Sequence, residues 1–287
     1  MKMCEQISRF DKNNKEIIYN LLVLKGESFI RGKILASYKE FTKGEKYSNF
    51  FLGISDQIDI LLIYFINDEI SASLPNRGPL IELCDEAINE YFRDENSKCL
   101  TTAIEDLKDL FANRTEFVRG SNIFDFKVNT FSVFEHYVVV LYEELTSTNP
   151  RSREKEQKLI KLIEDYNKEE CNEKKLSLLK RIKDISFYIS SSEKINYVLS
   201  RCKGIDSKKK DIRQLIDYYR NQRNTVHNLG IHKGESLSVT VKEGIEIELE
   251  KDKFSYTSDY NSAIFACREL MDIYETMHTS VTGEAVS

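Results

Sequence analysis

The sequence is poor in histidine, proline and glycine, with four, three and eleven of these residues among 287. Prolines and glycines most often interrupt helices and strands, so their scarcity favours long elements over a turn-rich β architecture. The histidines, at positions 136, 227, 232 and 278, are too widely spaced to suggest a cluster. Mechanisms that need several neighbouring imidazoles are therefore disfavoured from the start.

Recognisable metal and nucleotide motifs are also missing. The six cysteines occur singly, at positions 4, 84, 99, 171, 202 and 267. No Cys-x-x-Cys or Cys/His pair has metal-ligand spacing, so we predict neither a zinc site nor a disulfide framework. The patterns GxxxxGK[ST] and GxGxxG are absent as well. We expect no metal and no cofactor.

Targeting and membrane segments are not apparent. The first residues, MKMCEQISRFDKNN, lack the apolar centre of a signal peptide. The longest apolar run, Ile60–Ile66, is far shorter than the ~20 residues that span a bilayer. We expect a cytoplasmic protein with no membrane partner.

The residues that are present indicate a mainly helical protein. Hydrophobic residues make up 41% and charged residues 31% of the chain, which is typical of a soluble, helix-rich fold. Apolar residues recur at helical spacing in most of the chain. Helices are predicted over 12–43 (two patterns), 47–72, 80–94, 99–113, 127–146, 150–169, 172–189, 193–200, 208–228 and 258–278.

One segment has the period of a β-strand instead. Leu237, Val239 and Val241 alternate with polar residues, and Ile247 and Leu249 do so again after a Gly-containing turn. Alternation on both sides of a glycine turn predicts a β-hairpin near 236–250.

A domain boundary is predicted where helical periodicity weakens, over 114–126 around Gly120. We therefore expect a helical domain over 1–115, with a sensor or regulatory role. A second domain, over 127–280, holds the hairpin, and the tail 281–287 is predicted to be disordered.

Three polar residues share one edge of the predicted helix 208–228. With Arg220 at zero and ~100° per residue, Asn224 lies at about +40° and His227 at about −20°. The apolar residues of this helix gather at about −100°, with Arg223 nearer to them, at about −60°. These apolar residues are Ile212, Leu215, Ile216, Tyr219 and Val226. The polar stripe thus borders the buried face, where we expect a cleft or a subunit interface.

An arginine and a histidine at this edge suit metal-independent RNA cleavage. The guanidinium of Arg220 offers a planar fork of donors to phosphoryl oxygens. The imidazole of His227 can take and return a proton near neutral pH. The RNA 2′-hydroxyl would attack the adjacent phosphate, and the arginine would stabilise the charge of the transition state.

Local charge favours a polyanionic ligand at this helix. The chain carries a net charge of −5, but residues 201–232 hold eight Lys or Arg and three Asp, a net of +5. The remainder therefore carries −10. Candidate RNA-binding residues are Lys208, Lys209, Lys210, Arg213 and, by stacking on a base, Tyr219.

A structural interpretation of the same residues stays open. In it, Arg220 pairs with a carboxylate, His227 caps the helix end and Gly230 terminates the helix. Glu135, on the helix 127–146, is a candidate to orient Arg220 or His227. DNA binding by the basic patch is a weaker alternative, because no turn before a recognition helix is evident.

No catalytic role is predicted for the other three histidines. His136 is expected to point to solvent, His232 to lie in an exposed loop, and His278 to lie near a frayed helix end.

Arg220-Asn221 followed by His227 resembles the R-x(4–6)-H signature of the HEPN superfamily (higher eukaryotes and prokaryotes nucleotide-binding). Six residues intervene, the upper end of the range, and the residue after the arginine is polar, as in that family. The other register, Arg223 to His227, has three intervening residues and departs from the pattern. The helix TFSVFEHYVVVLYEEL upstream also resembles HEPN proteins, so that the likeness covers about 127–280.

The resemblance implies a helical bundle that forms a homodimer, in which two motif helices build one RNase site. Arg220 and His227 would be catalytic and Asn221 would position them, with Arg223 and Asn224 in support. Such proteins act as toxins or anti-phage (abortive-infection) effectors, so RNA and an antitoxin or phage-derived trigger protein are the expected partners. The alternative is a non-catalytic HEPN-like module for interaction or for regulatory RNA binding.

Overall fold

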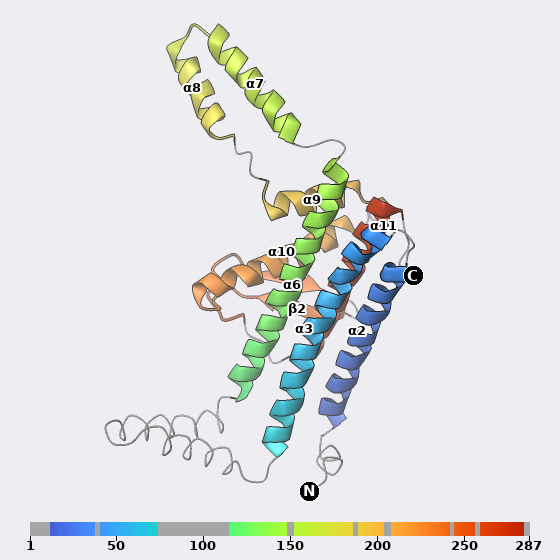
Figure 1. The fold of residues 1–287 in the computed structure, drawn as a ribbon. Coiled ribbons are helices and arrows are strands. Elements are labelled where there is room, and N and C mark those ends of the chain that lie inside the picture. Colours follow the sequence, from blue (N-terminus) through green and yellow to red (C-terminus); the bar gives the residue numbers. More distant parts are fainter. Residues whose placement is uncertain are drawn as a thin grey trace, which may run out of the picture. The chain divides into compact units, whose positions relative to one another are not determined.

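A computed structural model describes residues 12–37, 41–73, 115–147, 152–185, 189–203, 208–241, 244–255 and 259–283. These residues form eight α-helices, a 3-10 turn and a two-stranded hairpin (Figure 1). The prediction of a mainly α fold with one β-hairpin is confirmed. The helices predicted over 80–94 and 99–113 lie outside the described residues.

The chain groups into two compact units, which are described separately. The first combines Met1–Val133 with Lys210–Asp272, and the second combines Phe134–Lys209 with Ile273–Ser287.

In the first unit, α2 (Lys12–Ser37) and α3 (Phe41–Ser73) run antiparallel and side by side (Figure 1). The two patterns predicted within 12–43 thus belong largely to one helix. Each helix buries an apolar stripe at helical spacing. The fully buried residues of these stripes include Leu21, Leu24, Leu35, Phe50, Phe51, Ile54 and Ile58.

Helix α6 (Thr115–Ser147) passes through the predicted domain boundary without a break. Gly120 is buried within it. A glycine inside a helix costs only about 1 kcal/mol relative to alanine. The buried side chains that follow, among them Ile123 and Phe126, offset that cost.

The N-terminal helices also share a unit with the C-terminal elements, in contrast to the predicted division into 1–115 and 127–280. Arg31 of α2 pairs with Asp272 of α11 (Tyr260–Thr282) at 2.7 Å. Glu27 pairs with Arg268 of the same helix at 2.8 Å. Helix α2 is therefore part of the unit that holds the candidate motif.

The hairpin lies as predicted. Strands β1 (Leu237–Thr240) and β2 (Glu246–Leu249) pair antiparallel, with Val239 opposite Ile247. Val239, Ile247 and Leu249 are buried, whereas their neighbours along the strands are exposed or half-buried. Gly244 has a φ of +74° in the connection, a value that favours glycine.

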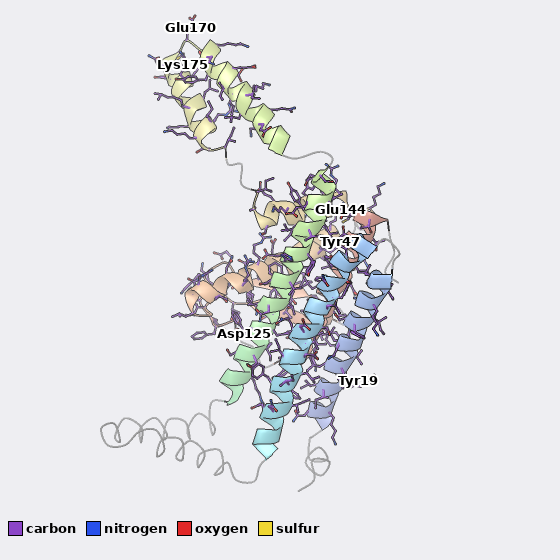
Figure 2. All side chains as sticks on the ribbon, in the orientation of Figure 1. Tyr19, Tyr47, Asp125, Glu144, Glu170 and Lys175 are labelled. Atoms are coloured by element: carbon purple, nitrogen blue, oxygen red, sulfur yellow. The ribbon has the colours of Figure 1, made fainter. Side chains whose placement is uncertain are left out.

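The second unit contains α7 (Ser152–Lys168), α8 (Asn172–Lys183) and α9 (Ser191–Arg201). Helix α9 starts with a capping box, in which Ser190 and Glu193 satisfy each other's backbone N–H groups. Helices α7 and α8 form a hairpin with Glu170 and Lys175 near its tip (Figure 2). Helix α8 buries none of its residues.

Helix α11 extends beyond the predicted end at 278. It ends at Gly283, whose φ is +76° and whose N–H donates to the Thr279 carbonyl at 2.9 Å. His278 is fully buried, so its expected place at a frayed end is wrong. Of the predicted disordered tail, residues 284–287 lie outside the described part of the chain.

One segment among the described helices, Tyr47–Asp68 of α3, is long and apolar enough to cross a membrane, with a mean hydropathy of 1.4. Asp59, near its middle, forms an ion pair with Lys25 of α2. Length and composition alone are weak grounds for a membrane span, because core helices share them.

Candidate functional site

Helix α10 (Lys209–Asn224) buries aliphatic and aromatic side chains, and two contacts with one ring of α6 fix its orientation. The ring of Tyr219 is 1% exposed and stacks on Phe131 of α6, with ring centroids 5.4 Å apart and planes inclined by 5°. The guanidinium of Arg223 lies over the same Phe131 ring, 5.9 Å from its centroid. These contacts fix the rotation of α10, and they explain why Arg223 falls close to the buried face.

The burial of Tyr219 corrects one prediction. Its ring is occupied by core packing and is not available to stack on an RNA base. Burial raises the pKa of its hydroxyl well above the ordinary value, so the hydroxyl stays protonated. Tyr219 is therefore a structural residue of α10.

Arg220 and Asn221 are both held by Asp217, one turn earlier on α10. The Arg220 guanidinium lies 2.9 Å from the Asp217 carboxylate, and 31% of the Arg220 side chain is exposed. The Asn221 amide donates to the Asp217 carbonyl at 2.9 Å. Nε of Arg220 is buried and has no hydrogen-bond partner in the described part of the chain. Asp217 and Arg220 are three residues apart on a helix, a spacing that places the two side chains next to each other, so the sequence could have indicated this pair.

The α-helix ends at Asn224, and a 3-10 turn, η1 (Thr225–Asn228), replaces its predicted last turn. A 3-10 turn advances by about 120° and about 2.0 Å per residue. Val226 is 49% exposed, although the sequence pattern placed it on the buried face. His227 is exposed, and this geometry returns it to about the same side as Asn224.

The distance from Arg220 to His227 follows from this geometry. Four α-helical steps and three 3-10 steps separate their Cα atoms by about 12 Å along the axis. Both side chains are at least partly accessible. A bound phosphate could contact both Arg220 and His227 only if the two side chains extend toward each other along the helix.

Hydrogen bonds to the loop after β2 anchor the 3-10 turn. Thr225 is 1% exposed, and its hydroxyl donates to the Gln222 carbonyl at 2.7 Å. The same hydroxyl lies 3.0 Å from the Ser255 hydroxyl. Ser255 in turn donates its N–H and its hydroxyl to the Gly230 carbonyl, at 2.9 and 3.1 Å. Because Ser255 is distant in sequence, no local pattern indicated this anchor.

The turn leads into a backbone reversal with two left-handed residues. Leu229 has a φ of +54° and is 83% exposed, and Gly230 has a φ of +81°. A positive φ is unusual for leucine and indicates local strain. The Gly230 N–H donates to the Thr225 carbonyl at 2.8 Å, which closes the turn as the structural interpretation expected of Gly230.

His232 is buried, at 3% exposure, which corrects its expected place in an exposed loop. The ring Nε2 of His232 lies 2.8 Å from the Glu235 carbonyl, and the backbone N–H of His232 donates to the Lys253 carbonyl at 2.9 Å. A Cβ atom on Gly234 would lie 2.8 Å from the His232 ring and 3.7 Å from the Asn221 amide oxygen. Glycine at 234 thus lets this loop close over His232 and Asn221.

Basic side chains lead along α10 toward Arg220. Lys208, Lys210 and Arg213 are exposed, and Lys209 is half-buried. At ~100° per residue, Arg213 lies about 20° from Arg220 around the helix. Lys209 and Arg213 therefore lie on the same side of α10 as Arg220, which is paired with the Asp217 carboxylate.

Glu135 is buried on the part of α6 that belongs to the second unit. Its role in orienting Arg220 or His227 remains a prediction. His136 is exposed, as expected. Among the described residues, no group of three or more His, Cys, Asp or Glu is arranged to hold a metal ion.

Comparison with known proteins gives no match: no family model, no curated protein and no solved structure matches this chain. The candidate site therefore rests on the residues and geometry of the chain itself.

Proposed function

We propose that the protein is a metal-independent endoribonuclease of HEPN type, with its active site at the end of α10. One observation carries the proposal. Arg220, Asn224 and His227 present partly or fully accessible side chains at a helix end that core contacts and the Ser255 hydrogen bonds hold in place. Groups that stabilise a transition state must be positioned before the substrate arrives.

The reaction is an intramolecular transesterification of the RNA phosphodiester. The 2′-oxygen attacks the adjacent phosphorus, the bond to the 5′-oxygen breaks, and the products are a 2′,3′-cyclic phosphate and a 5′-hydroxyl. His227 accepts the proton of the 2′-hydroxyl or, when protonated, donates one to the leaving 5′-oxygen. Arg220 stabilises the charge on the phosphoryl oxygens.

One histidine at the motif cannot serve as acid and base in the same step. A second copy of the chain would supply the complementary His227, so the proposal includes a homodimer. Lys208, Lys210 and Arg213 would guide the RNA backbone toward the motif. Asn221, fixed by Asp217 and covered by the 234 loop, would position Arg220.

The biological setting follows only from the HEPN resemblance. We propose a cytoplasmic bacterial toxin or anti-phage effector, controlled by an antitoxin or by a phage-derived trigger protein.

The test is cleavage of total RNA in a chelator-containing buffer by wild type and three variants. His227→Ala should lower the rate by at least about 100-fold, since general acid–base catalysis contributes about 10²–10⁴-fold. Arg220→Ala should lower it to a similar extent. His136→Ala is the matched control, because His136 is exposed and lies outside the motif. Equal cleavage by wild type and His227→Ala would reject the catalytic proposal.

The second candidate function is a non-catalytic module for interaction or regulatory RNA binding. The Arg220–Asp217 ion pair favours it, because it engages the guanidinium in a structural contact. This function predicts that Arg220→Ala weakens RNA or partner binding although the wild type cleaves no RNA. Filter binding with a labelled RNA, beside the cleavage assay, distinguishes the two functions.

A further inference from the structure

A cavity of about 320 Å³ lies in the first unit, and its lining includes Ser255, which also anchors the His227 turn. It is bounded by α6, α10, strand β2, the loop that follows β2, and the start of α11. Its volume is at the lower end of the ~300–1,000 Å³ typical of small-molecule sites. Its lining is rich in polar and charged side chains, which points to a polar ligand.

A buried lysine lines this cavity. Lys127 is 1% exposed, and its ammonium lies 3.2 Å from the Tyr218 hydroxyl. Among the described residues this is its one hydrogen bond, although an ammonium has three donors. Burial lowers the pKa of Lys127 to about 8, and the nearby charge of Asp259 acts in the opposite direction. The described residues therefore leave N–H donors of Lys127 without an acceptor in this cavity.

Most carboxylates of the cavity are already engaged. Glu246 accepts a hydrogen bond from Ser238, and Glu250 pairs with Lys253. Asp259 caps α11 by accepting from the N–H groups of Asn261 and Ser262, at 3.0 and 3.2 Å.

Glu248 differs from these carboxylates. It is exposed and lines the cavity, and its side chain forms no hydrogen bond or ion pair with the described residues. Among the described residues that line the cavity, the Glu248 carboxylate is thus without a partner, and the buried ammonium of Lys127 has one hydrogen bond.

We infer that this cavity binds a small zwitterion, with a carboxylate on Lys127 and an ammonium or guanidinium on Glu248. A purely anionic ligand would be repelled by the four acidic residues of the lining, and a purely cationic one by Lys127. A zwitterion of amino-acid size satisfies both ends at once. The site does not depend on the proposed ribonuclease activity.

The test is calorimetric titration of the full chain with L-arginine and with agmatine, which has the same guanidinium but no carboxylate. L-arginine should bind at least tenfold more tightly than agmatine. Lys127→Met should abolish this preference, and Glu248→Gln should weaken L-arginine binding at least fivefold. Lys158→Met and Glu156→Gln on α7 are the matched controls and should leave binding unchanged.

Wild-type protein offers a measurement that needs no variant. Acetic anhydride labelling followed by mass spectrometry should show that L-arginine protects Lys127 but not Lys158. Equal affinity for L-arginine and agmatine would overturn the inference. So would the absence of L-arginine binding, or labelling of Lys127 that L-arginine leaves unchanged.

Discussion

The end of α10 and the hairpin of α7 and α8 are both charge-rich helical segments, but their contacts differ. Helix α10 buries six residues, among them Tyr219 against Phe131. Helix α8 buries none, and Leu162 is the one buried residue among the described side chains of α7.

The charged side chains at the end of α10 are held in position by other residues, whereas those of α7 and α8 are mostly surrounded by solvent. Asp217 holds Arg220, and Ser255 and Gly230 hold the turn that carries His227. On the hairpin, the Lys174–Glu169 pair is 4.0 Å long and joins exposed to half-buried side chains, a type of contact that contributes little. Charge content alone would not show which segment is the better candidate for a functional site. The contacts that hold its charged side chains in place favour α10.

Hydrogen exchange should show this contrast most strongly. Amides in segments with few buried contacts open with free energies near zero, whereas core helices open at close to the global unfolding free energy, ~5–15 kcal/mol. We therefore expect the amides of α8 to exchange at least about 1,000-fold faster than those of Ile212–Tyr219. Similar protection in α8 and α10, measured by mass spectrometry, would remove the basis of the comparison.

Truncation of one side chain in each segment should give the next largest effect. Tyr219→Ala removes a fully buried stacked ring and should cost about 3–5 kcal/mol of unfolding free energy. Leu176→Ala, at a site that is 61% exposed on α8, should cost less than about 0.5 kcal/mol. Urea denaturation followed by circular dichroism measures both. A loss of more than 2 kcal/mol for the Leu176 variant would contradict the account.

Acid should destabilise the second unit, which contains α7 and α8, through His278 of α11. Burial lowers the pKa of His278 to about 4, against about 6.5 when unfolded. Above about pH 6.5 both states are neutral, and between these values only the unfolded state binds the proton. About 3 kcal/mol of stability is therefore lost as the pH falls from about 6.5 to about 4.

The His278→Gln variant is the control for this pH dependence. It should lose most of the change in urea midpoint between pH 7 and pH 4.5 that wild type shows. His136→Gln, at an exposed site on α6, should keep it. Identical pH profiles for wild type and His278→Gln would show that His278 does not titrate as described.

The smallest effect is expected at the strained reversal after His227. Leu229 adopts a positive φ, which costs a leucine about 1 kcal/mol more than an asparagine. Leu229→Asn should therefore raise the unfolding free energy by about 1 kcal/mol. Val226→Asn, at an exposed neighbour that is not in this conformation, should stay within about 0.5 kcal/mol of wild type. A destabilised Leu229→Asn protein would mean that the Leu229 side chain has a packing role.

The sequence was most informative where periodicity was strong and local. The alternation of Val239 and Ile247 gave the hairpin correctly, because one buried face fixes the register. It was least informative near Gly120, where weak periodicity suggested a boundary. The helix continues there because side chains farther along it are buried against other parts of the chain.

The sequence proposed residues for the candidate site but not their geometry. Arg220, Asn221 and His227 were proposed from their spacing and from the HEPN resemblance, and the basic residues from local charge. The 3-10 turn depends on Thr225 and Ser255, which are thirty residues apart, and the burial of His232 depends on Lys253. Such long-range hydrogen bonds leave no local pattern.

We propose above that the anchored end of α10 cleaves RNA with His227 as acid or base. The most direct measurement is mass spectrometry of the RNA termini after incubation with wild type and with His227→Ala in a chelator-containing buffer. We expect 2′,3′-cyclic phosphate and 5′-hydroxyl ends with wild type, and their near absence with the variant. The same ends at the same rate from both proteins, or 5′-phosphate ends from wild type, would contradict it.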